Sequence, residues 1–474
     1  MLFNSYLFLI FGIVVFTAYF AVSNWRARKV FLLLMSYIFY AAWNAPYLLL
    51  ILFSTVIDFF AGRKMAQTES RKARLPYLIL SLAGNLGVLS YFKYGGFAVE
   101  NFSAALNLIG VQYEPMPWSI LLPVGISFYT FQTLSYTIEI YRGNLKPTKS
   151  LLDFALFVTF FPQLVAGPIV RARKFLPQLV SAPKITAERF GWGLNLVVFG
   201  LFQKVAIADG IAAPIVNEIY AQEGILPLST VLLGCIGFSI QILCDFSGYS
   251  LVAIGLAACL GFSLPENFRA PYAALGYSDL WRRWHISMSG WFRDFLYSPL
   301  RDILKKKSLR NIIIAQVITL VLSGLWHGAA WTFVVWGLYN AIVIVTELIL
   351  KQYIGHWRFW KYKFLVPIYG LITYWLFAFG APLFRGETFG QAADMYRTFV
   401  LPPENHFYVG TVDRFLLLIC IATIFLVHSY LRTRSFEKVA YAIPIPARVF
   451  MLTGMMLAII LAGESSQEFI YFQF

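Results

Sequence analysis

Charged residues are scarce in this chain. Aspartate, glutamate, lysine and arginine together make up 13% of its 474 residues, whereas 59% of the residues are hydrophobic and 18% are aromatic. A soluble domain of this composition would lack the polar side chains needed to cover its surface, whereas a surface that faces lipid needs few of them. The composition therefore excludes an ordinary soluble protein and predicts a polytopic membrane protein.

Acidic residues are scarcer than basic ones: the chain has 23 acidic and 38 basic residues, and its formal net charge is +15. This excess could indicate a nucleic-acid partner, but the sequence contains no RNA- or DNA-binding motif. The lysines and arginines stand in short clusters between apolar runs, which is the pattern of cytoplasmic loops in membrane proteins. We therefore expect membrane lipid, and no nucleic acid, around this chain.

Several motifs of other protein classes are missing. The sequence has no HExxH, no Walker-type glycine loop and no G-x-S-x-G, so zinc proteolysis, nucleotide hydrolysis and the usual serine-hydrolase arrangement lack support. It also lacks the two similar halves that mark many secondary transporters. The few cysteines have no metal-ligand spacing, so we expect no metal and predict free, buried thiols. They are Cys235, Cys244, Cys259 and Cys420.

No lysine or arginine precedes the first apolar run, Tyr6–Val22, so this run is predicted to be a retained helix and not an export signal. Basic clusters between the later runs predict about a dozen crossings with both termini outside. The segment Leu151–Val170 has basic residues on both sides and is interrupted by Pro162 and Pro168, so we expect it to enter the membrane and return. Such broken backbone should lie inside the protein.

One histidine stands in a long apolar run, in the motif Gly324-Leu-Trp-His-Gly328. A titratable side chain at bilayer depth costs a few kcal/mol, so His327 is a functional candidate by default. We interpret it as a catalytic base. The alternative is a neutral histidine that forms a hydrogen bond between packed helices.

Asp245 is an acid in an otherwise apolar segment. A buried carboxylate is expected to be protonated or to pair with a cation, for which Arg269 and Arg282 are the candidates. Alternatively, Asp245 could orient a neighbouring group or relay a proton.

The stretch from Trp281 to Phe295 has helical spacing and predicts an amphipathic helix at the cytoplasmic interface. His285 would then face the protein, while Arg282 and Arg293 would face polar partners. Those arginines could bind the phosphates of a substrate or the headgroups of lipids.

Seven motifs, spread in order over almost the whole chain, resemble those of the membrane-bound O-acyltransferase family, and within it the bacterial alginate O-acetyltransferase branch. They are Pro123-Val-Gly-Ile-Ser-Phe-Tyr-Thr-Phe-Gln132, Phe161-Pro-Gln-Leu-Val-Ala-Gly-Pro168, Asp245-Phe-Ser-Gly-Tyr249, Leu264-Pro-Glu-Asn-Phe268, Trp281-Arg-Arg-Trp-His-Ile-Ser287, Gly324-Leu-Trp-His-Gly328 and Phe469-Ile-Tyr-Phe-Gln-Phe474.

The resemblance implies an all-α fold of about eleven to thirteen transmembrane helices, with re-entrant and interfacial amphipathic helices around a central funnel or tunnel. We expect one membrane domain over residues 1–474. Its N-terminal helices would occupy residues 1–117, a catalytic core residues 118–350, and its C-terminal helices residues 351–474.

The resemblance also assigns roles to residues. It implies that His327 is the catalytic histidine and that His285 occupies the second family position. An imidazole, whose ordinary pKa is near ~6.5, is suited to remove a hydroxyl proton at neutral pH. Trp326, Trp331 and Trp336 would exclude water from the site.

Further candidates for substrate binding or for a polar core are Asp245, Asn267, Arg282, Arg283, Ser323 and Trp326. Acyl transfer places negative charge on the carbonyl oxygen of the acyl group. This oxyanion could be stabilised by the hydroxyl of Ser323 or by backbone N–H groups near Gly324 and Gly328.

The expected function is the transfer of an acetyl group from cytosolic acetyl-CoA across the bacterial inner membrane toward an exported, alginate-like polysaccharide. The resemblance implies a periplasmic partner that handles the acetyl group, and no permanently bound cofactor, since acetyl-CoA is a substrate. Alternatives are another donor or acceptor, as in D-alanyl transfer to teichoic acid or acetylation of cellulose or peptidoglycan. A third possibility is a transporter of protons or small solutes.

Overall fold

The computed structural model describes residues 1–116, 118, 120–165, 167–304, 308–356, 362–463 and 469–470. Every regular element among these residues is helical, which confirms the all-α prediction. Ala166, within one motif, and residues 471–474, within the C-terminal motif, lie outside the described residues. The chain forms two compact units, one of residues 1–194 with 253–265 and the other of residues 195–252 with 266–474.

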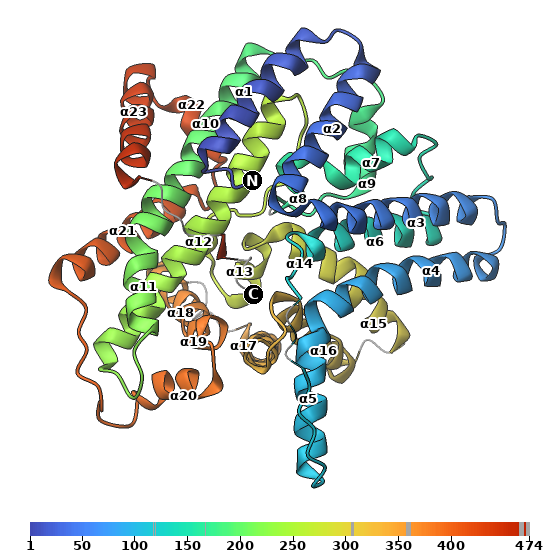
Figure 1. Cartoon of the computed structure of the whole chain (residues 1–474). Helices are drawn as coiled ribbons and strands as arrows, with labels where there is room; N and C mark the ends of the chain where they lie inside the picture. Colours follow the sequence, from blue (N-terminus) through green and yellow to red (C-terminus); the bar gives the residue numbers. More distant parts are fainter. Residues whose placement is uncertain are drawn as a thin grey trace. The chain divides into compact units, whose positions relative to one another are not determined.

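The first unit begins with long apolar helices and continues with shorter ones. Helices α3, α4 and α6 lie side by side in it (Figure 1). Its elements are α1 (Tyr6–Ala21), α2 (Trp25–Asn44), η1 (Ala45–Tyr47), α3 (Leu48–Ala66), α4 (Arg71–Leu89), η2 (Ser90–Tyr94), α5 (Gly95–Leu108), α6 (Ile126–Tyr141), α7 (Leu151–Thr159), α8 (Phe161–Leu164), α9 (Ala172–Phe175) and η3 (Leu176–Leu179). Helices α10 (Ala187–Leu201) and α12 (Leu228–Cys259) belong partly to each unit.

The interrupted segment behaves as its prolines predict. Helix α7 ends at Thr159, and α8 starts again with Pro162 in its first turn. The backbone groups at the break find partners inside the unit: the N–H of Phe161 donates to Ser36 Oγ (3.1 Å), and Gln163 Nε2 donates to the carbonyl of Phe157 (2.7 Å). The side chains of Phe161 and Gln163 are almost fully buried. The prediction that this broken backbone lies within protein is therefore confirmed.

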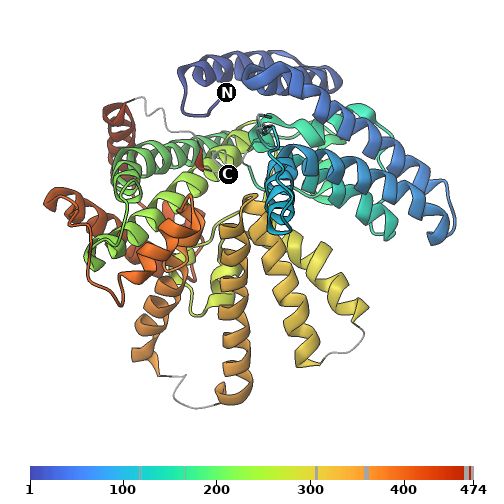
Figure 2. The same ribbon diagram turned by 60° about the horizontal axis from the view of Figure 1, so that its bottom comes forward.

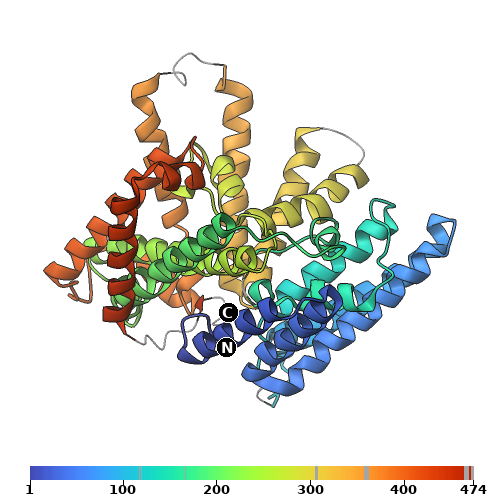
Figure 3. The ribbon, with the colours of Figure 1, turned by 90° about the horizontal axis from the view of Figure 1, so that it is seen from above.

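The second unit contains the helices that carry most of the candidate site residues, and α23 lies against η4 in it (Figure 3). Its remaining elements are η4 (Phe202–Ala212), α11 (Ala213–Tyr220), η5 (Pro271–Ala273), α13 (Tyr277–Arg283), α14 (Ile286–Phe292), η6 (Arg293–Tyr297), α15 (Ser298–Ile303), α16 (Leu309–His327), α17 (Trp331–Ile354), η8 (Lys363–Leu365), α18 (Val366–Ala378), α19 (Ala381–Arg385), α20 (Phe389–Arg397), α21 (Thr411–Leu431), α22 (Phe436–Ala442) and α23 (Ile445–Ala462).

Nine segments among the described residues are long and apolar enough to cross a membrane. The segment Trp25–Ala66 contains both α2 and α3, and α1 is a further apolar helix of 16 residues. With α2 and α3 counted separately and α1 included, the described residues contain eleven apolar helices. This number is the lower end of the predicted range of eleven to thirteen. All four cysteines are free, and three of them are buried, while Cys420 is half-buried.

Helices α16 and α17 form a closely packed hairpin (Figure 2). Two glycines make this approach possible. A Cβ on Gly324 would lie 2.2 Å from the carbonyl oxygen of Phe333, and one on Gly337 would lie 2.5 Å from that of Leu320. No side chain fits in so little space. Basic residues at both ends of the apolar run from Asn311 to Leu350 predict that this run crosses the membrane and returns, with a turn near His327 and Gly328. The hairpin does turn between His327 and Trp331, which places His327 at the end of α16.

Candidate active site

His327 is the last residue of α16, and only 4% of its surface is exposed. Three aromatic rings contact its imidazole edge to face. The ring centroids of Trp326, Trp336 and Phe384 lie 5.0, 5.2 and 5.2 Å from that of His327. The imidazole is therefore held in an apolar environment in which polar interactions are stronger than in water.

A cavity of about 20 Å³ borders His327. The bulky residues that line it include Phe238 and Ile242 from α12, Trp336 from α17 and Phe384 from α19. All of these belong to the second unit. The imidazole of His327 thus borders this cavity.

His285 lies at a break in the chain and not inside one continuous helix. Helix α13 ends at Arg283 and α14 starts at Ile286, while His285 between them has φ 42° and ψ 54°, in the left-handed region. The predicted helix through Trp281–Phe295 is therefore wrong in its continuity. The expected burial is correct, because His285 is 0% exposed. A left-handed conformation is uncommon for a residue with a side chain and persists where surrounding contacts hold it.

Those contacts come from Asn267. The hydroxyl of Ser287 donates to Asn267 Oδ1 (2.6 Å), the amide Nδ2 of Asn267 donates to Ser250 Oγ (3.0 Å), and the N–H of Ile286 donates to the carbonyl of Asn267 (2.9 Å). His285 Nδ1 lies 3.4 Å from the same Oδ1. Since Oδ1 is an acceptor, this bond requires a proton on Nδ1, and Nε2 is then an acceptor. Asn267 therefore fixes both the backbone and the tautomer of His285.

Burial lowers the pKa of His285 from 6.5 to about 3, because the charged imidazolium would lose its hydration. The folded protein keeps this ring neutral, whereas the unfolded chain binds a proton below about pH 6.5. The contribution of His285 to stability is therefore present above pH 6.5 and is lost as the pH falls from there toward 3.

We expect the free energy of unfolding to decrease by about 2 kcal/mol between pH 7 and pH 5 because of His285. Thermal unfolding of the purified protein at the two pH values measures this change. His285→Asn, whose amide can replace the Nδ1 donor, should show a smaller decrease. An equal decrease in the variant and the wild type would assign the effect to other groups.

Trp326 connects the two histidines. Its ring centroid lies 5.0 Å from that of His327 and 6.0 Å from that of His285. The structure thus brings together His327, Trp326, His285 and Asn267, all of which the sequence identifies as candidates. Trp336 is also buried, but Trp331 is 53% exposed, so the burial of the site depends on the other two tryptophans and on Phe384.

Asp245 pairs with a cation, as expected, but the cation is not the predicted one. Lys204 Nζ lies 2.8 Å from Asp245 Oδ1 and 2.8 Å from Asp209 Oδ1, and all three side chains are about 3% exposed. Arg269 instead forms an exposed ion pair with Glu266. Lys204 reaches α12 because Gly200 and Gly248 let the two segments approach: a Cβ on Gly200 would lie 2.5 Å from the carbonyl oxygen of Gly248.

The remaining candidates are Arg282, Arg283 and Ser323. Arg282 is exposed. Arg283 pairs with Asp279 (3.1 Å) and donates to the carbonyl of Arg432 (3.3 Å), so its interactions are structural. Ser323 is buried one turn before His327 on α16.

Sequence reasoning missed Phe246 and Phe384. Phe246 packs edge to face on His285 with its centroid at 4.5 Å. A phenylalanine in an apolar run carries no signal that distinguishes a site wall from ordinary packing.

Comparison with known proteins identifies the family of this chain. Residues 144–389 match the membrane-bound O-acyltransferase family. The chain is 35% identical over 402 residues to the probable alginate O-acetylase of Pseudomonas putida, covering 84% of this chain and 79% of that protein. It is 34% identical over 413 residues to the peptidoglycan O-acetyltransferase of Helicobacter pylori, covering 80% and 75%. It is 29% identical over 283 residues to the teichoic acid D-alanyltransferase of Bacillus subtilis, covering 58% and 71%.

The chain belongs to the membrane-bound O-acyltransferase family. It is a multi-pass membrane enzyme that transfers an acyl group to a hydroxyl. Family membership thus favours the enzyme over the transporter that the buried charges alone would also allow.

Proposed function

We propose that this enzyme resides in the bacterial inner membrane and transfers acetyl from cytosolic acetyl-CoA toward an exported, alginate-like polysaccharide. The similarity to the probable alginate O-acetylase of Pseudomonas putida supports this acceptor. The name of the Helicobacter pylori relative also specifies O-acetyl transfer, which supports acetyl as the group transferred. A periplasmic protein that receives or handles the acetyl group completes the proposal.

The observation that carries the proposed chemistry is the contact between His327 and the cavity. In the proposed step the acceptor hydroxyl gives its proton to a ring nitrogen of His327 while its oxygen attacks the thioester carbonyl. A C–O bond forms and the C–S bond breaks. The proton then passes to the departing thiolate, so that the products are the acetyl ester and the free thiol.

The aromatic rings around His327 support transfer over hydrolysis. Trp326, Trp336 and Phe384 are each less than a tenth exposed, so they restrict the access of water to the imidazole. A site that excludes water protects a reactive thioester from side reactions. We assign to His285, neutral and fixed by Asn267, the role of positioning the thioester next to Trp326.

We propose that the donor, acetyl-CoA, first binds at the exposed Arg282 of α13. Arg282 is exposed at the end of this helix, two residues before the buried Trp284. A guanidinium binds phosphate oxygens with two parallel hydrogen bonds, which suits the phosphates of CoA. The cavity beside His327 would then hold the acyl group, while the nucleotide part of CoA stays near Arg282.

Labelled acetyl-CoA tests the proposed function directly. We expect purified wild-type protein, given an alginate oligosaccharide and the periplasmic fraction of an alginate-producing strain, to release CoA thiol and to place label on the oligosaccharide. Fragments of teichoic acid, cellulose and peptidoglycan are offered in parallel reactions, and label on one of these and not on the alginate oligosaccharide would reassign the acceptor. If acetyl-CoA is neither bound nor consumed, the donor assignment is wrong.

A further inference from the structure

The cavity beside His327 is small. It measures about 20 Å³, whereas a single water molecule needs about 10–15 Å³ of such space. There is room for a group of about two heavy atoms and not for an extended alkyl chain. Small residues at the α18–α19 connection, namely Ala378, Gly380 and Ala381, line the cavity together with the bulky side chains.

Phe384 lines the cavity and packs against side chains from several helices. Its ring centroid lies 5.2 Å from that of His327, 5.0 Å from that of Trp336 and 5.1 Å from that of Phe333. The ring of Phe238 is a further neighbour at 6.0 Å. Only 3% of Phe384 is exposed. A ring packed on so many sides cannot turn away without disturbing its neighbours.

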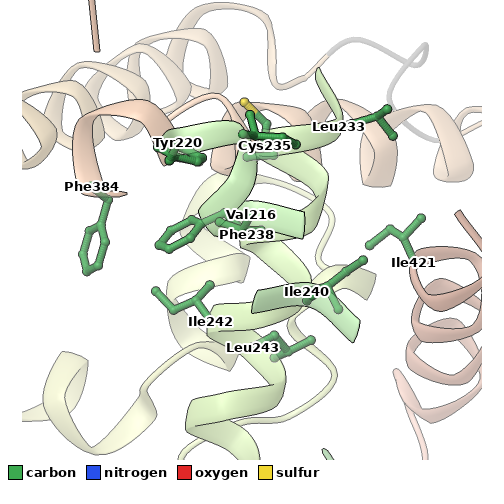
Figure 4. Close-up of a cluster of buried hydrophobic side chains, with 14 of the residues drawn as sticks. Val216, Tyr220, Leu233, Cys235, Phe238, Ile240, Ile242, Leu243, Phe384 and Ile421 are labelled. Carbon is green, nitrogen blue, oxygen red and sulfur yellow. The ribbon is translucent and has the colours of Figure 1, made fainter. Parts of the chain in front are cut away.

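The direction of the side chain agrees with a limiting role. Figure 4 shows Phe384 extending from the α19 ribbon on the side where Phe238 and Ile242 extend from α12. All three line the cavity. The five-residue helix α19 begins directly after Gly380, where a Cβ would lie 3.3 Å from Trp336 Nε1, so the turn that presents Phe384 is packed closely against α17.

We propose that Phe384 limits the length of the acyl group, so that the site accepts acetyl and rejects longer acyl chains. This inference deepens the proposed function and depends on it. The carbonyl carbon of the acyl group has to reach His327 for transfer to occur, so its tail extends into the cavity. A third or fourth carbon in the tail then meets the ring of Phe384, and the ring cannot yield without breaking its contacts with Trp336 and Phe333.

The test compares acetyl-, propionyl- and butyryl-CoA as donors for wild type and Phe384→Ala, with CoA thiol release as the measurement. One additional methylene in a hydrophobic pocket changes kcat/KM about 10- to 200-fold. We therefore expect wild type to use butyryl-CoA at least about 100-fold less efficiently than acetyl-CoA. In Phe384→Ala the donor ratio, which is kcat/KM for acetyl-CoA divided by kcat/KM for butyryl-CoA, should fall by about 10-fold or more, because butyryl-CoA turnover rises.

Two further variants make the result specific. Phe384→Leu removes the ring but keeps an apolar side chain, and it should shift the ratio in the same direction even if the alanine variant does not fold. Phe425→Ala removes a phenyl ring that packs on Tyr272 and Tyr374 in the same core and does not line the cavity. It should leave the donor ratio unchanged.

The outcomes separate this inference from the proposed function. Wild type that transfers butyryl as well as acetyl would overturn the role of Phe384 and leave acyl transfer intact. So would folded Phe384 variants that keep the wild-type ratio. Wild type that consumes none of the three thioesters would overturn the proposed donor, and the inference with it.

Discussion

His327→Ala is expected to lower the rate of acetyl transfer about 10²- to 10⁴-fold, which is the range for loss of a general base. The reason is that the acceptor hydroxyl would have to attack before its proton is removed. Binding of acetyl-CoA should change little, because the proposed role of His327 is proton transfer and not donor binding. Single-turnover measurements with labelled acetyl-CoA, together with equilibrium binding of the donor, separate the two effects.

The chain offers a matched control for this experiment. His406 is an exposed histidine in the loop between α20 and α21, so His406→Ala removes the same side chain from a position that does not line the cavity. It should turn over acetyl-CoA at the wild-type rate. If His327→Ala elutes as a folded protein and keeps wild-type turnover, the base assignment is wrong.

The same kinetic assay compares the contribution of His285 with that of His327. His285 is neutral and is held by Asn267, so we assign it a positioning role. His285→Ala should reduce turnover less than His327→Ala does, and it should raise KM for the donor. A loss of folded protein alone would lower the apparent kcat and leave KM unchanged. Wild-type kinetics in His285→Ala would leave this residue a structural one.

The sequence predicts the hairpin at His327 from the distribution of basic residues. They stand at both ends of the apolar run from Asn311 to Leu350, so the run is expected to cross the membrane and return, with its turn near His327 and Gly328. The break at His285 could not be predicted in this way. Helical periodicity continues on both sides of it, and the left-handed conformation is held by Asn267, which belongs to another segment of the chain.

The partner of Asp245 could not be predicted either. Arg269 and Arg282 lie in the nearest basic stretch, but Lys204 belongs to a separate apolar segment. Which of them meets Asp245 depends on helix packing, here on the glycine contact between Gly200 and Gly248. Phe384 illustrates the same limit, since its importance lies entirely in what surrounds it.

The buried ion group of Lys204, Asp209 and Asp245 should be the most sensitive structural feature of the second unit. Asp245 also accepts a hydrogen bond from the N–H of Ile470 (2.7 Å) through its other oxygen. The next residue in α12, Phe246, packs on His285. The ion group therefore fixes α12 and residues 469–470 next to the proposed site.

Lys204→Met is expected to destabilise the protein by about 3–5 kcal/mol, because it removes one cation and leaves two buried carboxylates close together. Thermal unfolding in detergent, followed by size-exclusion chromatography, measures this loss. Lys351→Met is the control: it removes a lysine from an ion pair with Glu347 in which Lys351 is 61% exposed, and it should cost at most about 1 kcal/mol.

A triple variant distinguishes charge from packing as the cause. Lys204→Met combined with Asp209→Asn and Asp245→Asn removes the uncompensated charges while nearly preserving side-chain volume. It should recover part of the lost stability, since neutral amides are far less costly to bury than unpaired carboxylates. If the triple variant is no more stable than Lys204→Met, the loss arises from the packing of the lysine stem. If Lys204→Met itself unfolds at the wild-type temperature, the ion group does not hold α12 in place, and the route from it through Phe246 to His285 has no energetic basis.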